Sequence, residues 1–207
     1  MPFADALLFI AASLALALAP GPDNLFVLTQ SALHGRRAGL LVTLGLCSGL
    51  AVHTAAVALG VAALFQASAL AFTLLKVVGA AYLLYLAWGA WQAGASRLPA
   101  DAAPRLTDRT LYLRGIVMNV TNPKVAIFFL AFLPQFADPD RGSVPAQVLL
   151  CGLLFSGSAL VVFSAIALGG GLLGGWLQRT PQAQRWLNRV AAAIFVAMAA
   201  RLATAVR

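Results

Sequence analysis

Charged residues are scarce in this sequence. Only 10% of the 207 residues are charged, whereas 61% are hydrophobic, and the mean hydropathy is +0.89. A soluble domain carries about 25% charged residues, so a chain of this composition is hard to reconcile with a water-facing surface. No segment is both long and polar enough to fold as a separate soluble domain. We therefore predict one integral membrane domain that comprises residues 1–207.

Cysteines and acidic residues are also rare. The two cysteines, Cys47 and Cys151, lie inside apolar segments, so they indicate neither an extracellular disulfide framework nor a metal-ligand spacing. All six acidic residues are aspartates, and the motifs of serine hydrolases and zinc peptidases are missing. The sequence predicts a protein that is not an enzyme, with no catalytic residue, no metal site and no cofactor.

Basic residues outnumber acidic ones, which gives a formal net charge of +8 and a pI of about 10.8. In a soluble protein this excess would raise the question of nucleic-acid binding. Here the arginines mostly occupy short segments between apolar runs, and no basic stripe is interleaved with aromatic residues. We attribute the charge to orientation in the lipid bilayer and predict no nucleic-acid partner.

Apolar runs of about 20 residues recur along almost the whole chain, as is typical of helices that span a bilayer. We predict an all-α, polytopic membrane protein with six transmembrane helices. The first run lacks the basic n-region of a signal peptide, so we interpret it as a retained span. Arg201 falls within the last run, where snorkelling toward the headgroups would accommodate it. The predicted spans are residues 4–29, 39–65, 68–92, 112–136, 146–177 and 186–206.

The distribution of charge between the spans predicts the orientation. Because Lys and Arg favour the cytoplasm, the first, third and fifth connections are predicted to be cytoplasmic and both termini outside. The connections on the other side carry Asp138, Asp140 and Arg141. The basic residues of the cytoplasmic connections are Arg36, Arg37, Arg97, Arg105, Arg109, Arg114, Arg179, Arg185 and Arg189.

A polar linker, residues 93–111, divides the chain into halves 1–92 and 112–207. Each half contains three predicted spans. Because three is odd, the second half enters the membrane from the opposite face, as in an inverted repeat. We predict two inverted three-helix repeats joined by a cytoplasmic linker.

Prolines interrupt the first span of each half, in "APGPDNLF" and "NVTNPKVAIFF". The breaks contain Pro20, Gly21 and Pro22 in the first half and Pro123 in the second. A proline removes a backbone hydrogen bond, and in hydrocarbon the freed groups cannot turn to water. Interrupted helices at matching places in two halves are the best sequence indication of a transporter's binding site. We expect the two breaks to converge near the middle of the bilayer.

Charged residues lie at both breaks. Asp23 follows the first and Lys124 the second, and Lys76 is a third charge within an apolar run. On insertion scales, an ionised side chain near mid-membrane costs about 2.5 to 3.5 kcal/mol, so it persists where it is paired or functional. Asp23 and a lysine can form a structural ion pair or take part in proton coupling. Lys76 can instead lie near a membrane face.

These residues suit a zwitterionic amino acid. Asp23 can bind the ammonium group, and unpaired N–H groups at the start of the second half-helix, with Lys124, can hold the carboxylate. Asn24, Asn119, Thr121 and Asn122 supply neutral hydrogen bonds near the breaks. Asp23 can also take up a proton, because burial favours the neutral form of a carboxyl group. Protonation would then release the ammonium group.

The ordered segments "APGPDNLFVL", "LKVVGAAYLLYLAW" and "NVTNPKVAIFFLAFLPQF" resemble the LysE/RhtB family of amino-acid exporters over essentially the whole chain. The resemblance implies six spans, location in the bacterial inner membrane, and efflux of neutral or cationic amino acids driven by the proton gradient. It also implies dimers or larger homo-oligomers. The matching positions are Pro20, Gly21, Pro22, Asp23, Asn24, Lys76, Gly79, Tyr82, Asn119, Asn122, Pro123 and Lys124.

Two other transport functions stay open. Related transporters of thiol reductants carry one reactive cysteine in each half, and Cys47 and Cys151 are placed roughly symmetrically. Neither adjoins a break or a cation that would activate the thiol, so a buried apolar role is the alternative. A divalent-cation exporter needs several oxygen, sulfur or imidazole ligands, which one aspartate beside lysines matches poorly. His53 is interpreted as a packed, hydrogen-bonded side chain.

Overall fold

The computed structural model describes residues 1–19, 21–67, 69–93 and 106–204, so Pro20 and most of the predicted linker 93–111 lie outside the described residues. Within these ranges the chain is helical and contains no strand. Two short 3-10 helices, η1 and η2, follow α6. The elements are α1 (Phe3–Leu18), α2 (Pro22–His34), α3 (Arg36–Ala67), α4 (Ala69–Gln92), α5 (Asp108–Val120), α6 (Pro123–Phe132), η1 (Leu133–Phe136), η2 (Pro139–Arg141), α7 (Val144–Arg179) and α8 (Pro181–Thr204).

The helices coincide with the predicted spans. The first predicted span is the pair α1 and α2, bent by 60°, and the fourth is α5 with the segment Pro123–Phe136, bent by 51°. Among the described residues, three helices are long and apolar enough to cross a membrane, or up to five if each bent pair counts as one span. The predicted span 68–92 corresponds to α4, which is not among these five. The protein is therefore an all-helical, multi-pass membrane protein.

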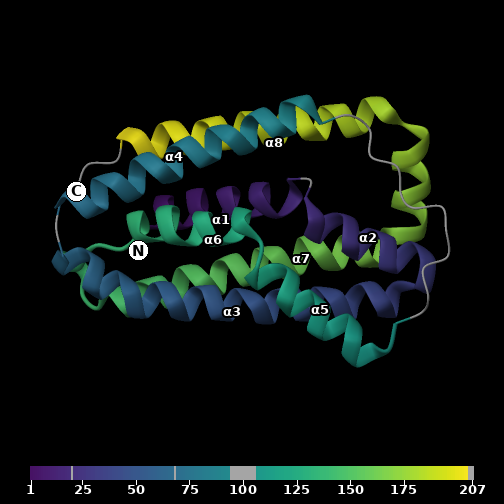
Figure 1. Cartoon of the computed structure of the whole chain (residues 1–207), viewed down its shortest axis with the longest axis horizontal. Helices are drawn as coiled ribbons and strands as arrows, with labels where there is room; N and C mark the ends of the chain where they lie inside the picture. The colour runs from purple at the N-terminus through teal and green to yellow at the C-terminus, as the bar shows by residue number, and fades with distance from the viewer. Residues whose placement is uncertain (20, 68, 94–105, 205–207) are drawn as a thin grey trace.

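One half of each broken span, α1 in the first and α6 in the second, lies in the interior of the bundle. Figure 1 shows α4 and α8 side by side along one face, and α3, α5 and α7 along the other. Between them lie α1 and α6, where α6 contacts α4, and α1 contacts both α7 and α8. The N-terminus and the end of α8 lie at one end of the bundle in this view. This arrangement buries the second half-helix, α6, and the end of α1.

Aromatic side chains form the core around α6. Phe128, Phe129 and Phe132 are almost completely buried, because α6 contacts helices on several sides. The ring of Phe128 lies 4.9 Å from that of Phe132 and 5.2 Å from that of Phe155 on α7. Phe9 on α1 contacts Phe136 at 5.0 Å. These contacts hold α6 against α1 and α7, which fixes the position of the second break.

Small residues allow α3 and α5 to approach closely. A Cβ atom built on Gly45 would overlap the backbone carbonyl of Tyr112, and one on Gly115 would overlap that of Val42. In lipid, helix association depends on such close backbone contact, since lipid tails are as apolar as the side chains.

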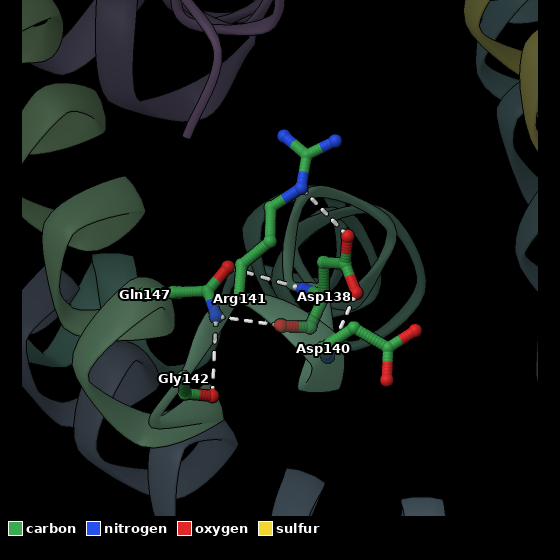
Figure 2. A network of polar contacts seen from close by, with 5 residues as sticks. All are labelled: Asp138, Asp140, Arg141, Gly142 and Gln147. Atoms are coloured by element: carbon green, nitrogen blue, oxygen red, sulfur yellow. Dashed lines mark hydrogen bonds and ion pairs between the residues drawn. The ribbon is translucent and has the colours of Figure 1, made fainter.

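A polar turn connects η1 to α7 (Figure 2). Asp138 accepts a hydrogen bond from the backbone N–H of Asp140 and pairs with Arg141 at 2.8 Å. The Gln147 side chain donates to the carbonyls of Asp138 and Gly142, and its oxygen accepts from the N–H of Asp138. Gly142 adopts a φ of 109°, which favours glycine. The turn therefore satisfies several of its own polar groups.

Arg201, near the end of α8, is stabilised inside the protein. Its Nη2 atom lies 3.8 Å from Asp5 Oδ1, and its guanidinium carbon lies 4.8 Å from the centre of the Phe136 ring. The arginine thus joins the end of α8 to the start of α1 and to η1. Snorkelling of Arg201 toward the headgroups stays a prediction beside these contacts.

Candidate functional site

The first break separates α1 from α2. The helix α1 ends at Leu18, and α2 starts at Pro22, whose missing N–H and fixed φ suit the first helical position. The residue that precedes α2, Gly21, has extended backbone and offers no side-chain cap. The backbone at the end of α1 and the start of α2 is therefore left for other parts of the molecule to satisfy.

The second break is capped by its own residues. Asn122 precedes Pro123, and its Oδ1 atom accepts a hydrogen bond of 3.0 Å from the backbone N–H of Lys124. The carbonyl oxygen of Asn122 accepts from the N–H groups of Val125 and Ala126 at 3.1 and 3.0 Å. The sequence predicted unpaired N–H groups at the start of α6. The structure contradicts this prediction, because the Asn122 cap occupies them.

The two breaks meet. The Asn122 side chain donates a hydrogen bond of 3.0 Å to Asp23 Oδ2 across the interface between the halves. The Lys124 ammonium group donates to the carbonyl oxygens of Leu16 and Ala19, at 3.2 and 3.1 Å. Asp23, Asn122 and Lys124 are exposed by only 2%, 4% and 8%. The contact is therefore a buried polar cluster formed by residues about a hundred positions apart.

Lys124 acts as a cap for α1. The last turn of a helix presents unpaired carbonyls and a partial negative charge, which favour a cation. Asn24 supplements this cap, since its Nδ2 atom donates to the carbonyl of Ala17 at 2.7 Å. Gly21 leaves room for the ammonium group, because a Cβ atom there would lie 3.1 Å from Lys124 Nζ. In the described part of the chain no salt bridge joins Lys124 to Asp23, although each charge lies within electrostatic range of the other.

Three side-chain oxygen atoms in the cluster have no hydrogen-bond donor within the described part of the chain. They are Asp23 Oδ1, Asn24 Oδ1 and Asn119 Oδ1. Asn119 is exposed by 1% and Asn24 by 9%, so water does not satisfy these atoms freely. Asn119 lies close enough to Asp23 to interact with the carboxylate. A buried acceptor without a donor costs about 1–3 kcal/mol, so such atoms require an explanation.

His53, on α3, supports the end of α5. Its Nε2 atom lies 3.1 Å from the carbonyl oxygen of Asn119, to which it can donate a hydrogen bond, and its ring packs 5.6 Å from that of Phe129. His53 also lies within electrostatic range of Asp23, as does Lys124. This position agrees with the interpretation of His53 as a packed, hydrogen-bonded side chain.

The arrangement suits a small cation. Among the described residues, one carboxylate and two amide oxygens present unpaired acceptors, while the Lys124 ammonium group already donates to two backbone carbonyls. Unpaired acceptors favour a ligand that brings several donors, such as a primary ammonium group. The site therefore offers more to the positive end of a zwitterion than to its negative end.

The other candidate residues lie on other helices. Lys76 is a partly buried residue of α4 that has interactions of its own. Cys47 on α3 and Cys151 on α7 are free thiols, and the sulfur of Cys151 lies 3.9 Å from that of Met1. No group of three or more metal-ligating side chains occurs among the described residues.

Sequence reasoning missed the partners of Lys124. They are backbone carbonyls, which no side-chain pattern reveals. It also missed Gly49 on α3, where a Cβ atom would lie 2.7 Å from the Cβ atom of Asn119. The cap of α6 could have been predicted from the sequence, because an asparagine directly before a proline is typical of a helix N-terminus.

Comparison with known proteins finds a family of translocators and relatives that are membrane proteins or efflux proteins. A family model described as "LysE type translocator" matches residues 14–206. A "Homoserine/homoserine lactone efflux protein" of Salmonella typhimurium is 34% identical over 198 residues, which cover 95% of both chains. An "Uncharacterized membrane protein" of Vibrio cholerae is 33% identical over 199 residues, or 96% of both chains. A "Leucine efflux protein" of an Enterobacter species is 28% identical over 95% of this chain and 93% of its own. No solved structure gives a significant match.

Proposed function

The chain belongs to the family of LysE type translocators, and we propose on this premise that it exports amino acids from the bacterial cytoplasm as a secondary transporter. Relatives that align over nearly their whole length are named as efflux proteins for homoserine and for leucine. Both compounds carry one α-ammonium group and a side chain without charge. The proposed substrates are accordingly small amino acids, neutral ones first.

The observation that carries the site assignment is the state of Asp23. Its carboxylate is 2% exposed, has one oxygen without a hydrogen-bond donor, and forms no ion pair among the described residues. A charge in such a place needs a partner, since burial of an unpaired charge is costly. In the proposed mechanism the substrate ammonium group is that partner. Asn24 and Asn119 complete its hydrogen bonds, and Asn122 and Lys124 hold the two breaks in register.

Proton antiport follows from the same carboxylate. When the substrate leaves, Asp23 takes up a proton, which removes the buried charge. A protonated Asp23 has no net charge to attract an ammonium group, so proton and substrate compete for the same oxygen atoms. Each transport cycle would then exchange substrate for a proton taken from the outside.

The proposed architecture places this site in the middle of six spans. The bent pairs and α3, α4, α7 and α8 would form two inverted three-helix repeats, with both termini outside the inner membrane. The ion pair of 2.6 Å between Arg37 and Asp108 supports the proposed location of the first and third connections on the same side of the membrane. It brings the first connection beside the start of α5, where the third connection ends. A homo-oligomer, such as a dimer, remains part of the proposal by family resemblance.

The experiment that tests this function is an efflux screen with the purified chain in liposomes. Vesicles are loaded with each amino acid in turn, and release is followed with and without an imposed pH gradient. We expect release of at least one small neutral amino acid, accelerated when protons can move in the opposite direction. If no amino acid is released faster than from loaded liposomes that lack the protein, the proposed function is wrong. If release occurs but ignores the pH gradient, proton antiport is wrong.

A further inference from the structure

We propose that Gln30, on α2, forms a second binding position for the ammonium group of the substrate, separate from the cluster at the two helix breaks. A substrate that moves between Asp23 and the end of α2 binds there in passing. The inference rests on the proposed function, because it adds a step to the path of the same substrate. The ligand class is a primary ammonium compound.

Gln30 is a buried polar side chain with an unpaired acceptor. It is exposed by 5%, and its Oε1 atom has no hydrogen-bond donor in the described part of the chain. A buried acceptor without a donor is costly, so it requires an explanation. A ligand that brings N–H donors removes this cost. Because an amide oxygen carries no full charge, it holds an ammonium group more weakly than the carboxylate of Asp23 does, which suits a position of passage.

The position of Gln30 on α2 aligns it with Asp23. The two residues are seven positions apart in one helix, which corresponds to about two turns and about 10 Å along the helix axis. Residues at this spacing share nearly the same face of a helix. Val27 lies between them on this face, and it is fully buried and apolar, so its side chain offers no acceptor. Gln30 is therefore the next side-chain acceptor on this face for a substrate that leaves Asp23 toward the end of α2.

The adjacent polar residue, Ser31, already has a structural role. Its hydroxyl group donates a hydrogen bond to the carbonyl oxygen of Ala167 on α7. A Cβ atom built on Gly39 of α3 or on Gly170 of α7 would overlap the Ser31 side chain, so both helices pack closely against it. This contact holds α2 against its two main neighbours, α3 and α7. The unpaired oxygen of Gln30 is not explained by this packing, which leaves it for a ligand.

The first test measures the rate of efflux and the affinity for substrate separately. Gln30→Met keeps the approximate size of the side chain and removes the acceptor. The wild-type chain and the variant are compared in liposomes that are loaded with the amino acid that the wild-type chain releases, and equilibrium binding of that amino acid is measured in lipid nanodiscs. We expect the maximal rate to fall about 10-fold, since one charge-assisted hydrogen bond is lost, and the affinity to stay within about twofold, since Asp23 is intact.

Gln135→Met is the matched control for this test. The Oε1 atom of Gln135 is also buried without a donor, but Gln135 lies on η1 and not on α2. We expect Gln135→Met to release the amino acid at the wild-type rate. An equal loss of rate in both variants would show that any buried glutamine has this effect.

A cysteine variant gives an independent readout of access to the position. Gln30→Cys is made in a chain in which Cys47 and Cys151 are replaced by alanine, and it is treated with 2-aminoethyl methanethiosulfonate, a thiol reagent that carries a primary ammonium group. We expect the reagent to modify the introduced cysteine, and the transported amino acid at saturation to slow the reaction. Thr43→Cys, at a fully buried position of α3, is the control and should not react.

Each outcome separates the inference from the proposed function. If the wild-type chain releases no amino acid, the proposed function fails and the inference fails with it. If the wild-type chain is active and Gln30→Met has the same rate, or loses rate only as Gln135→Met does, the inference is overturned while the proposed function stands. An introduced cysteine that does not react, or that reacts without protection by the amino acid, overturns it as well. The cysteine experiment tests the position even if Gln30→Met does not fold.

Discussion

The two helix breaks look alike in sequence but differ in how their polar groups are satisfied. At the second break, Asn122 caps α6 with its side chain and its carbonyl, so the helix start is closed locally. At the first break, Gly21 gives α2 no side-chain cap, and α1 is capped from a distance by Lys124. The unpaired oxygens of Asp23 and Asn24 belong to the first break.

This difference assigns different roles to the two halves. The second half supplies structure at the site, since the Lys124 ammonium group and the Asn122 side chain both donate hydrogen bonds to the first half. The first half supplies the carboxylate, which forms no salt bridge among the described residues, although Lys124 lies within electrostatic range. Removal of the carboxylate should therefore stop transport without unfolding the protein. Changes at the second break should act on stability, and on transport where they also displace Asp23 or Asn119.

The largest expected effect is that of Asp23→Asn. The substitution keeps the size of the side chain but removes the charge that binds the ammonium group. We therefore expect efflux from liposomes to fall to the level of loaded vesicles that lack the protein. Asp140→Asn is the matched control, because Asp140 lies in the exposed turn of Figure 2 and should leave efflux unchanged. Efflux at the wild-type rate in Asp23→Asn would contradict the claim that the carboxylate of the first break binds the substrate.

The second prediction concerns Lys124→Met. The variant loses two charge-assisted hydrogen bonds to the end of α1, and we expect it to lower the free energy of unfolding by about 1–3 kcal/mol. Lys124→Arg keeps the charge and should recover part of the loss. Thermal unfolding in detergent measures both. Unchanged stability of Lys124→Met would show that α1 does not depend on this cap.

A third prediction tests how closely α3 supports Asn119. In Gly49→Ala the added Cβ atom would lie 2.7 Å from the Asn119 Cβ atom and 2.8 Å from its Oδ1 atom. Overpacking of this kind costs about 1–3 kcal/mol, and displacement of Asn119 should also lower efflux several-fold. Gly60→Ala on the same helix meets no described atom within 4 Å and serves as the control. Equal efflux from both variants would argue against a role for Asn119.

The smallest expected effect separates the two functions of Asn122. Asn122→Ala removes the cap of α6 and the hydrogen bond to Asp23, and loss of the cap alone costs about 1 kcal/mol. Asn122→Ser keeps a capping oxygen but is too short to reach Asp23. We expect the serine variant to recover stability while its substrate affinity stays reduced. Thr121→Ala, at an exposed position beside the break, should match wild type in affinity.

Much of the fold could be predicted from the sequence, because it follows from local patterns. Apolar runs located the helices to within a few residues, and Pro22 and Pro123 marked the starts of α2 and α6. The site could be predicted only in part. The contacts of Lys124 with Leu16 and Ala19, and of His53 with Asn119, join backbone atoms to distant side chains, and residue identity does not encode backbone carbonyls. The pairing of Arg201 with Asp5 depends equally on the tertiary arrangement.

The central claim is that the carboxylate of Asp23 holds the substrate ammonium group. The most direct measurement is equilibrium binding of radiolabelled leucine and homoserine to the purified wild-type chain and to Asp23→Asn, after circular dichroism has shown that both are folded. We expect saturable binding of at least one of the two amino acids to the wild-type chain and none to the variant at the same concentrations. Equal affinity in the two proteins would contradict the account.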